Sequence, residues 1–405
     1  MKFIYLLVPF LVCLMLSVRQ QEKTIIYSTP KKDILKASEQ LNHLTIFQKN
    51  KCLNNDSIQI KINPSTPYFE RPKEEIYLNF DIIIKNLHTH TIFLREIEGL
   101  IYNRKGELIR KVFINPNQRP SIEFAKLSGI IPNDSVLIFN PFHTFGRDVD
   151  LHMIQLNFQF TDFLFGNFII SPIKVFPVDY HSKNKFSIPV KGEQILVWEG
   201  HDYYSNHRRF NYFSPFVKKQ GITNNLQRYA YDFVFVDSTS QMYRGSQKNE
   251  TNWYNRVMDD NHDYYCFGSP VYAAGDGVVV EVHDGEPDNR RVEPNDLMTR
   301  PKAYGGNYII IKHGSDEYTW YSHLMYHSID VKAGDRVTNK NRIASIGASG
   351  SALFPHLHFE LRKGRSDGFV EGVPIYFSDY ESTGIKSEKV KANDFLSPGE
   401  LIKNK

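Results

Sequence analysis

The chain has 405 residues, which is more than one ordinary domain needs, so two domains are the natural expectation. Hydrophobic residues make up 41% and charged residues 23%, the composition of a folded soluble protein. The formal net charge of +4 comes without a dense block of Lys and Arg, and it is too weak to indicate a nucleic-acid partner.

The N-terminus carries an apolar run over residues 3–18, preceded by Lys2. The run is short for a membrane span and suits the core of a signal peptide. No clean small-x-small cleavage site follows, so residues 1–20 are expected to be either a signal peptide or an uncleaved membrane anchor. In both cases the rest of the chain is exported, as a periplasmic or cell-envelope protein. Residues 21–50 are mixed and polar, and we expect a linker there.

Residues 51–180 are predicted to form a β-sandwich domain of immunoglobulin-like type. Its clearest strand alternates with period two: apolar residues at 76, 78, 80, 82 and 84 share one face, and Tyr77, Asn79, Asp81 and Lys85 share the other. Turn signals separate further runs, at 100–102, 108–114, 136–139, 153–160 and 168–175.

A linker is expected over 181–190, followed by a second β-rich domain over 190–380 and a polar, loosely packed tail over 381–405. Beyond the N-terminal run the only cysteines are Cys52 and Cys266, which fall in different predicted domains. Two thiols cannot build a thiolate zinc site, so a metal in this chain would be bound through His and carboxylate side chains.

The segment 355–362, with sequence PHLHFELR, is the sharpest chemical signal. Alternate residues of a strand point to one face, so His356, His358 and Glu360 project together while the leucines and Phe359 face the core. Two imidazoles side by side on an apolar strand suit metal binding. Taken alone, the pair fits surface or core-edge histidines equally well.

Two other residues strengthen the metal-binding interpretation. Asp232 interrupts an otherwise apolar strand, where a carboxylate is costly unless it is paired, hydrogen-bonded or bound to a metal. His323 lies in the aromatic segment 320–324, with sequence WYSHL, from which it could lean into a pocket. Each residue alone has an ordinary structural explanation.

The order of motifs resembles the M23 (LytM/lysostaphin-type) peptidases. The resemblance spans roughly residues 227–362, about a third of the chain, and does not cover the N-terminal half. It rests on a series of segments in the family's order: GSPVYAAGDGVVV at 268–280, YGGNYIIIKHG at 304–314, WYSHL at 320–324, VKAGDRV at 331–337, IGASG at 346–350 and PHLH at 355–358.

The resemblance implies a LytM-type antiparallel β-sheet domain with a catalytic Zn²⁺. It identifies His358 and Asp232 as zinc ligands and His356 and His323 as catalytic histidines. The implied activity is a metalloendopeptidase that hydrolyses the peptide of bacterial peptidoglycan, in agreement with export. It names no protein partner.

The first metal motif departs from the family, because Arg228 stands where the family has a zinc-binding histidine, four residues before Asp232. A guanidinium cannot ligate zinc. His207 is the best candidate for the third ligand, since it precedes the motif in the same domain, and His201 is the next; absence of a third ligand stays open. We expect Arg228 to hydrogen-bond Asp232 or a substrate carboxylate.

Two other functions stay open. A metal-free relative would keep the fold as a binding or activating module of the cell envelope, and the substitution at Arg228 favours it. A lipoyl- or biotinyl-type carrier is suggested by the segments 268–274 and 331–337, but the chain lacks a modifiable Lys at a hairpin tip between them.

Overall fold

The computed structural model of the protein describes residues 51–52, 57–71, 75–115, 129–162, 166–170, 172–200, 202–244, 260–364, 370–383, 388–390 and 394–405. All of them belong to one compact unit, Asn50–Lys405. The predicted signal peptide or anchor and most of the predicted linker lie outside the described residues. Among the described residues, no helix is long and apolar enough to span a membrane.

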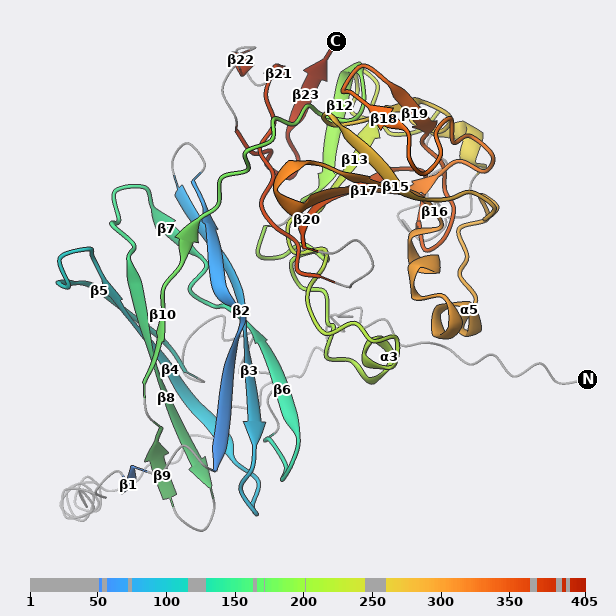
Figure 1. Cartoon of the computed structure of the whole chain (residues 1–405). Helices are drawn as coiled ribbons and strands as arrows, with labels where there is room; N and C mark the ends of the chain where they lie inside the picture. The colour runs from blue at the N-terminus through green and yellow to red at the C-terminus, as the bar shows by residue number, and fades with distance from the viewer. Residues whose placement is uncertain are drawn as a thin grey trace, which may run out of the picture. The chain divides into compact units, whose positions relative to one another are not determined.

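Two β-sheets occupy the N-terminal part (Figure 1). Buried residues of both sheets belong to one hydrophobic cluster that extends from Ile58 to Val175. The first sheet has the order β1 (Lys51–Cys52), β9 (Gly166–Ile169), β8 (Met153–Asp162), β4 (Phe93–Tyr102) and β5 (Leu108–Ile114), with β10 (Ile173–Val175) also pairing with β8. The second has the order β11 (Val178–Asp179), β2 (Ile58–Glu70), β3 (Glu75–Asn86) and β6 (Ser135–Phe139), with β7 (Thr144–Gly146) also pairing with β3. The run predicted over 168–175 is thus two strands. The immunoglobulin-like type of the sandwich stays a prediction.

Strand β3 explains how the N-terminal part packs. The apolar residues at alternate positions from Ile76 to Ile84 are all 0% exposed, as their period-two pattern predicts. On the opposite face, however, Asn79 and Asp81 are also buried. Because a polar face would otherwise be hydrated, another part of the chain must cover it.

The C-terminal part is built on a ten-stranded sheet, in which β17, β20, β13 and β12 are consecutive neighbours (Figure 1). A mainly β fold is therefore confirmed. The full order is β18 (Arg336–Val337), β15 (Gly277–His283), β16 (Asn307–Lys312), β17 (Glu317–Leu324), β20 (Leu357–Lys363), β13 (Tyr231–Phe235), β12 (Gly192–Glu199), β23 (Leu401–Asn404), β21 (Tyr380–Ser382) and β22 (Glu388–Val390). Outside this sheet, β14 (Pro270–Tyr272) pairs with β19 (Arg342–Ser345), and the short helices are α3 (Pro215–Lys219), α5 (Pro294–Thr299) and the 3₁₀ turns η1 (Asn261–Asp263), η2 (Pro301–Gly305) and η3 (Gly314–Asp316).

The expectation of a loosely packed tail over 381–405 is wrong for the described part of that segment. Strand β23 pairs with β12 inside the large sheet, and Leu396 and Ile402 are fully buried. The segment 181–190 likewise packs through Phe186 and Val190 into the hydrophobic core of the C-terminal part, which also contains Leu396 and Ile402, rather than forming a free linker. In both segments a few apolar residues among polar neighbours suffice to anchor the chain, because burying one large apolar side chain contributes about 1.5–3 kcal/mol.

Candidate metal centre

Asp232 and His358 meet because they lie on neighbouring strands. Asp232 belongs to β13 and His358 to β20, and the two residues are directly paired in the antiparallel register. Leu357, Phe359 and Leu361 turn to the opposite face of β20 and are fully buried in the core, as the alternation predicts. The Nδ1 atom of His358 lies 3.0 Å from Oδ1 of Asp232.

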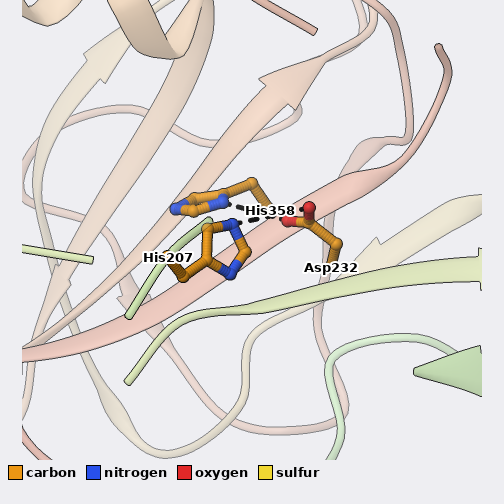
Figure 2. A group of neighbouring side chains, drawn as sticks. All are labelled: His207, Asp232 and His358. Carbon is orange, nitrogen blue, oxygen red and sulfur yellow. Dashed lines mark hydrogen bonds and ion pairs between the residues drawn. The ribbon is translucent and has the colours of Figure 1, made fainter. Parts of the chain in front are cut away.

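His207 reaches the same place from the connection between β12 and β13. Its Nε2 atom lies 3.5 Å from Oδ2 of Asp232, and its ring centroid lies 4.8 Å from that of His358 (Figure 2). Donor atoms of His207, Asp232 and His358 all lie within 4.8 Å of one another. The structure therefore brings the three predicted ligands together, whereas His201 lies outside the described residues.

This donor set fits zinc. Two donor atoms bound to one tetrahedral zinc at about 2.1 Å lie about 3.4 Å apart, close to the separation of His207 and Asp232. The Nδ1 atom of His207 lies 3.2 Å from the carbonyl oxygen of Gly200. A carbonyl can only accept, so Nδ1 carries the proton and Nε2 keeps a lone pair for a metal.

The predicted catalytic histidines lie beside these three residues. The ring of His323 lies 4.8 Å from that of His356 and 5.9 Å from that of His358, and Nε2 of His356 is 3.6 Å from Oδ1 of Asp232. Each Nδ1 faces a backbone carbonyl: that of His323 lies 2.9 Å from Ser349 O, and that of His356 lies 2.8 Å from Phe354 O. Because a carbonyl oxygen can only accept, Nδ1 of each ring carries the proton, and the Nε2 lone pair of both imidazoles is available as a base.

His323 has a left-handed backbone conformation, with φ = 60°. A non-glycine residue in this region is uncommon, and such conformations cluster at functional sites. The nearby carbonyl oxygen of Ser349 fixes the ring, and the carbonyl oxygen of His323 accepts a hydrogen bond from Gly347 N at 3.0 Å. These contacts hold the residue in its unusual conformation at the end of β17.

The charges within the group are strongly coupled. Burial by itself raises the pKa of Asp232, but the imidazoles of His207 and His356 and the hydrogen bond from His358 hold this pKa well below its usual value. Burial lowers the pKa of His358, but Asp232 and Glu360 outweigh it and raise that pKa to about 9.

The pKa values of His323 and His356, which lie outside the proposed ligand set, are both lowered. Burial and the neighbouring His356 and His358 hold the pKa of His323 well below its usual value. Burial also lowers the pKa of His356, although Asp232 acts in the opposite direction. Both imidazoles are therefore neutral near pH 7, the form that accepts a proton.

A cavity of about 100 Å³ borders the group on the side of His323 and His358. Apolar side chains around α3, including Phe216 and Leu226, line one part of it, and Tyr304 lines another. A mainly apolar cavity with a few convergent polar groups is the usual form of a small-ligand site.

The expectation that Arg228 bonds Asp232 is wrong. Its guanidinium instead pairs with Asp81 at 2.7 Å and with Glu371, and its side chain is fully buried. The alternation of β3 predicts only that Asp81 lies on the polar face of the strand. The local pattern therefore gives no sign that Asp81 is buried; only its contact with the arginines reveals this.

Part of the chain is similar to known proteins. Residues 262–370 match the family described as Peptidase family M23. Over 94 residues the chain is 42% identical to the peptidoglycan DD-endopeptidase ShyA of Vibrio cholerae, a match that covers 23% of this chain and 17% of that protein. Over 108 residues it is 39% identical to the peptidoglycan DD-endopeptidase ShyB of the same organism, covering 26% and 21%.

An uncharacterized metalloprotease of Buchnera aphidicola is 32% identical over 125 residues, which cover 29% of this chain and 28% of that protein. The chain thus matches between about a sixth and less than a third of the length of these relatives. Among solved structures, the M23 metalloprotease pseudoalterin aligns with a TM-score of 0.26 at 17% identity, covering 50% of this chain and 84% of that one.

The family match includes His323, His356 and His358, whereas His207 and Asp232 precede it. The ordered motifs and the match together confirm the resemblance drawn from the sequence, and the chain contains a domain of peptidase family M23.

Proposed function

We propose that the protein is a zinc-dependent endopeptidase that hydrolyses peptide bonds of bacterial cell-wall peptidoglycan. The observation that carries the proposal is the convergence of His207, Asp232 and His358 on one point, with His323 and His356 beside them. Three protein ligands with adjacent bases are the usual composition of a catalytic zinc site.

In this proposal Asp232, His358 and His207 hold the zinc. Zinc bound there would polarise the scissile carbonyl and lower the pKa of a water molecule. His323 and His356 are neutral and present Nε2 lone pairs, so they are suited to accept a proton from the attacking water and return it to the leaving amine. The carbonyls of Ser349 and Phe354 orient the two rings and stabilise their protonated forms.

The substrate class follows from the relatives and from the predicted export. Two relatives are named as peptidoglycan DD-endopeptidases. The family match over residues 262–370 contains three of the five site residues. We place the protein in the periplasm or cell envelope, delivered by residues 1–20 as a signal peptide or membrane anchor. The same proposal includes the division into a β-sandwich domain over 51–180 and a peptidase domain over 190–380.

The direct test is hydrolysis of purified peptidoglycan by the full chain and by the variants His358→Ala and His207→Ala, with bound zinc measured for each. We expect the wild type to release peptide fragments, to lose activity with a chelator and to recover it with zinc. Both variants should lack bound zinc and activity. Equal activity in all three proteins would contradict the mechanism.

An inactive binding or activating module is the second candidate, because Arg228 occupies the position at which the family has a zinc-binding histidine. The presence of His207 beside Asp232 weakens this alternative, since it offers the missing nitrogen donor from another segment. Wild-type protein that binds no zinc, even when zinc is supplied, would favour the inactive module over the enzyme.

A further inference from the structure

A buried ionic cluster connects strand β3 of the N-terminal part with two segments that lead to the candidate metal ligands. We call Asp81, Arg208 and Arg228 the Asp81 cluster. All three side chains are 0% exposed. Asp81 lies on β3, Arg208 directly follows His207, and Arg228 lies four residues before Asp232.

Arg208 is bound to β3 through all three of its guanidinium nitrogens. Nη1 donates to Oδ1 of Asp81 at 2.7 Å, Nε donates to Oδ1 of Asn79 at 2.9 Å, and Nη2 donates to the carbonyl oxygen of Phe80 at 2.6 Å. Three donors of a rigid guanidinium, bound to three consecutive residues of one strand, fix its position and its orientation.

Arg228 uses the other carboxylate oxygen. Its Nη2 donates to Oδ2 of Asp81 at 2.7 Å, and its Nε donates to Glu371. The hydroxyl of Tyr212 also donates to Oδ2 of Asp81, at 3.0 Å. One carboxylate of β3 therefore serves two arginines from the two chain segments that supply His207 and Asp232.

The loop that carries His207 is held from its own side as well. The side-chain amide of Asn225 donates to the carbonyl oxygens of His207 and Arg208, each at 3.0 Å. The backbone N–H of Arg208 donates to Oγ of Ser205 at 2.9 Å. With its backbone anchored by Asn225 and its guanidinium anchored by β3, Arg208 leaves little freedom to the neighbouring His207.

Within the Asp81 cluster, the charge of Asp81 is what keeps the two arginines buried. Burying a guanidinium is strongly unfavourable unless an opposite charge and hydrogen bonds compensate it. Without the charge of Asp81, Arg208 would keep only the neutral acceptors Asn79 and Phe80 O. We expect Arg208 to move toward water in that case and to displace His207 with it.

We propose that Asp81 is a positioning residue of the metal centre, which fixes the loop carrying His207 so that the N-terminal part of the chain is required for tight zinc binding. This inference rests on the proposed function, because it presumes that His207 binds zinc. It goes beyond that function by assigning a role to a residue more than a hundred positions away from every candidate ligand.

The test compares zinc affinity in the full chain for wild type and for Asp81→Asn, by competition with a chromophoric chelator. The substitution keeps the shape of the side chain and removes its charge. We expect the Kd for zinc to rise by about 10- to 100-fold, as is typical when a partner that orients a metal ligand is lost. The visible absorption spectrum of the cobalt-substituted variant should also change, because it reports the geometry of the ligands.

Ile82→Val is the matched control, since Ile82 is the next residue of β3, is 0% exposed and packs in the core of the N-terminal part. It should lower thermal stability without changing the zinc Kd or the cobalt spectrum. If Asp81→Asn does not fold, Asn79→Ala tests the positioning role instead, because it removes one hydrogen bond of Arg208 and keeps the ion pair with Asp81. We expect it to raise the zinc Kd by several-fold.

Unchanged zinc affinity in Asp81→Asn, or in Asn79→Ala where only that variant folds, would overturn the inference and leave the proposed function standing. An equal loss of affinity in Ile82→Val would also overturn it, because the effect would then be general destabilisation. Wild-type protein that binds no zinc would overturn the proposed function together with the inference, so the two failures are distinguishable.

Discussion

The Nε2 atom of His207 lies 3.5 Å from Oδ2 of Asp232, although the two residues are separated by a long connection between neighbouring strands. The family's usual arrangement places the nitrogen donor and the carboxylate four residues apart. In the metal centre that we propose, the nitrogen donor comes from a loop instead, and Arg228, four residues before Asp232, pairs with Asp81.

Removing His207 should therefore remove the metal. We expect His207→Ala to weaken zinc binding by at least about 100-fold, because losing even an outer partner of a ligand costs about 10- to 100-fold. Metal analysis of the purified variant, with competition titration, gives the result. His262→Ala is the control, because that side chain is 78% exposed. Zinc retained in His207→Ala would rule out His207 as a ligand.

His323 and His356 should behave differently from the ligands. We expect His323→Ala and His356→Ala to keep near-stoichiometric zinc while the rate of peptide hydrolysis falls by about 10²- to 10⁴-fold, the usual contribution of a general acid or base. Zinc content and turnover are measured on the same preparations. Loss of zinc in either variant would indicate a ligand rather than a proton-transfer group.

Arg228→His should not restore the family's metal motif. The side chain at this position is directed to Asp81 and Glu371, so a histidine there would lack access to the metal. Breaking a buried ion pair should cost about 3–5 kcal/mol of unfolding free energy, measured by denaturant titration.

The control for Arg228→His is Arg71→His. The ion pair between Arg71 and Asp179 is partly exposed, with side-chain exposures of 29% and 30%, and should contribute no more than about 1 kcal/mol. Recovery of zinc binding in the double variant His207→Ala/Arg228→His would contradict the structural role assigned to Arg228.

The protonation of His143 should make the free energy of unfolding depend on pH. Its ring stacks on that of Tyr203 at 3.8 Å, and burial together with the charges of Arg208 and Arg209 lowers its pKa from 6.5 to about 4. A histidine whose pKa is lowered by folding contributes stability that is complete above the unfolded pKa, about 6.5. That contribution is lost as the pH falls from 6.5 through 4, because the unfolded state binds the proton first.

The variant His143→Gln isolates this contribution. We expect the difference in unfolding free energy between wild type and variant to shrink as the pH is lowered from 7 to about 4. Denaturant titration at each pH measures this difference. A difference that stays constant over this range would show that His143 titrates normally in the folded protein.

Much of the C-terminal half could be predicted from local patterns. The alternation over 355–362 gives both the strand and the face on which His356 and His358 lie, because side chains of a strand alternate between two faces. Asp232 was found because a carboxylate within an apolar strand requires a partner. Both arguments depend only on residues that are close in sequence.

The packing of the C-terminal tail and the role of Arg228 could not be predicted in this way. Strand β23 lies in a largely polar segment, but it pairs with β12 and buries Ile402 in the core. Arg228 was expected beside Asp232 because of its sequence spacing, yet its partner is Asp81 on a strand almost 150 positions away. Spacing along the chain does not report contacts between distant strands.

The sequence by itself predicted the mainly β fold, the ordered motifs of an M23 domain and the five candidate site residues, with His207 as one of several possibilities for the third ligand. These features can be predicted because they depend on the periodicity of apolar residues and on the local cost of placing polar groups among apolar ones. The tertiary structure places His207 beside Asp232 and His358, and it revealed Asp81 as the partner of two buried arginines. Those relationships join strands and loops distant in sequence, and only the folded chain brings their atoms within bonding distance.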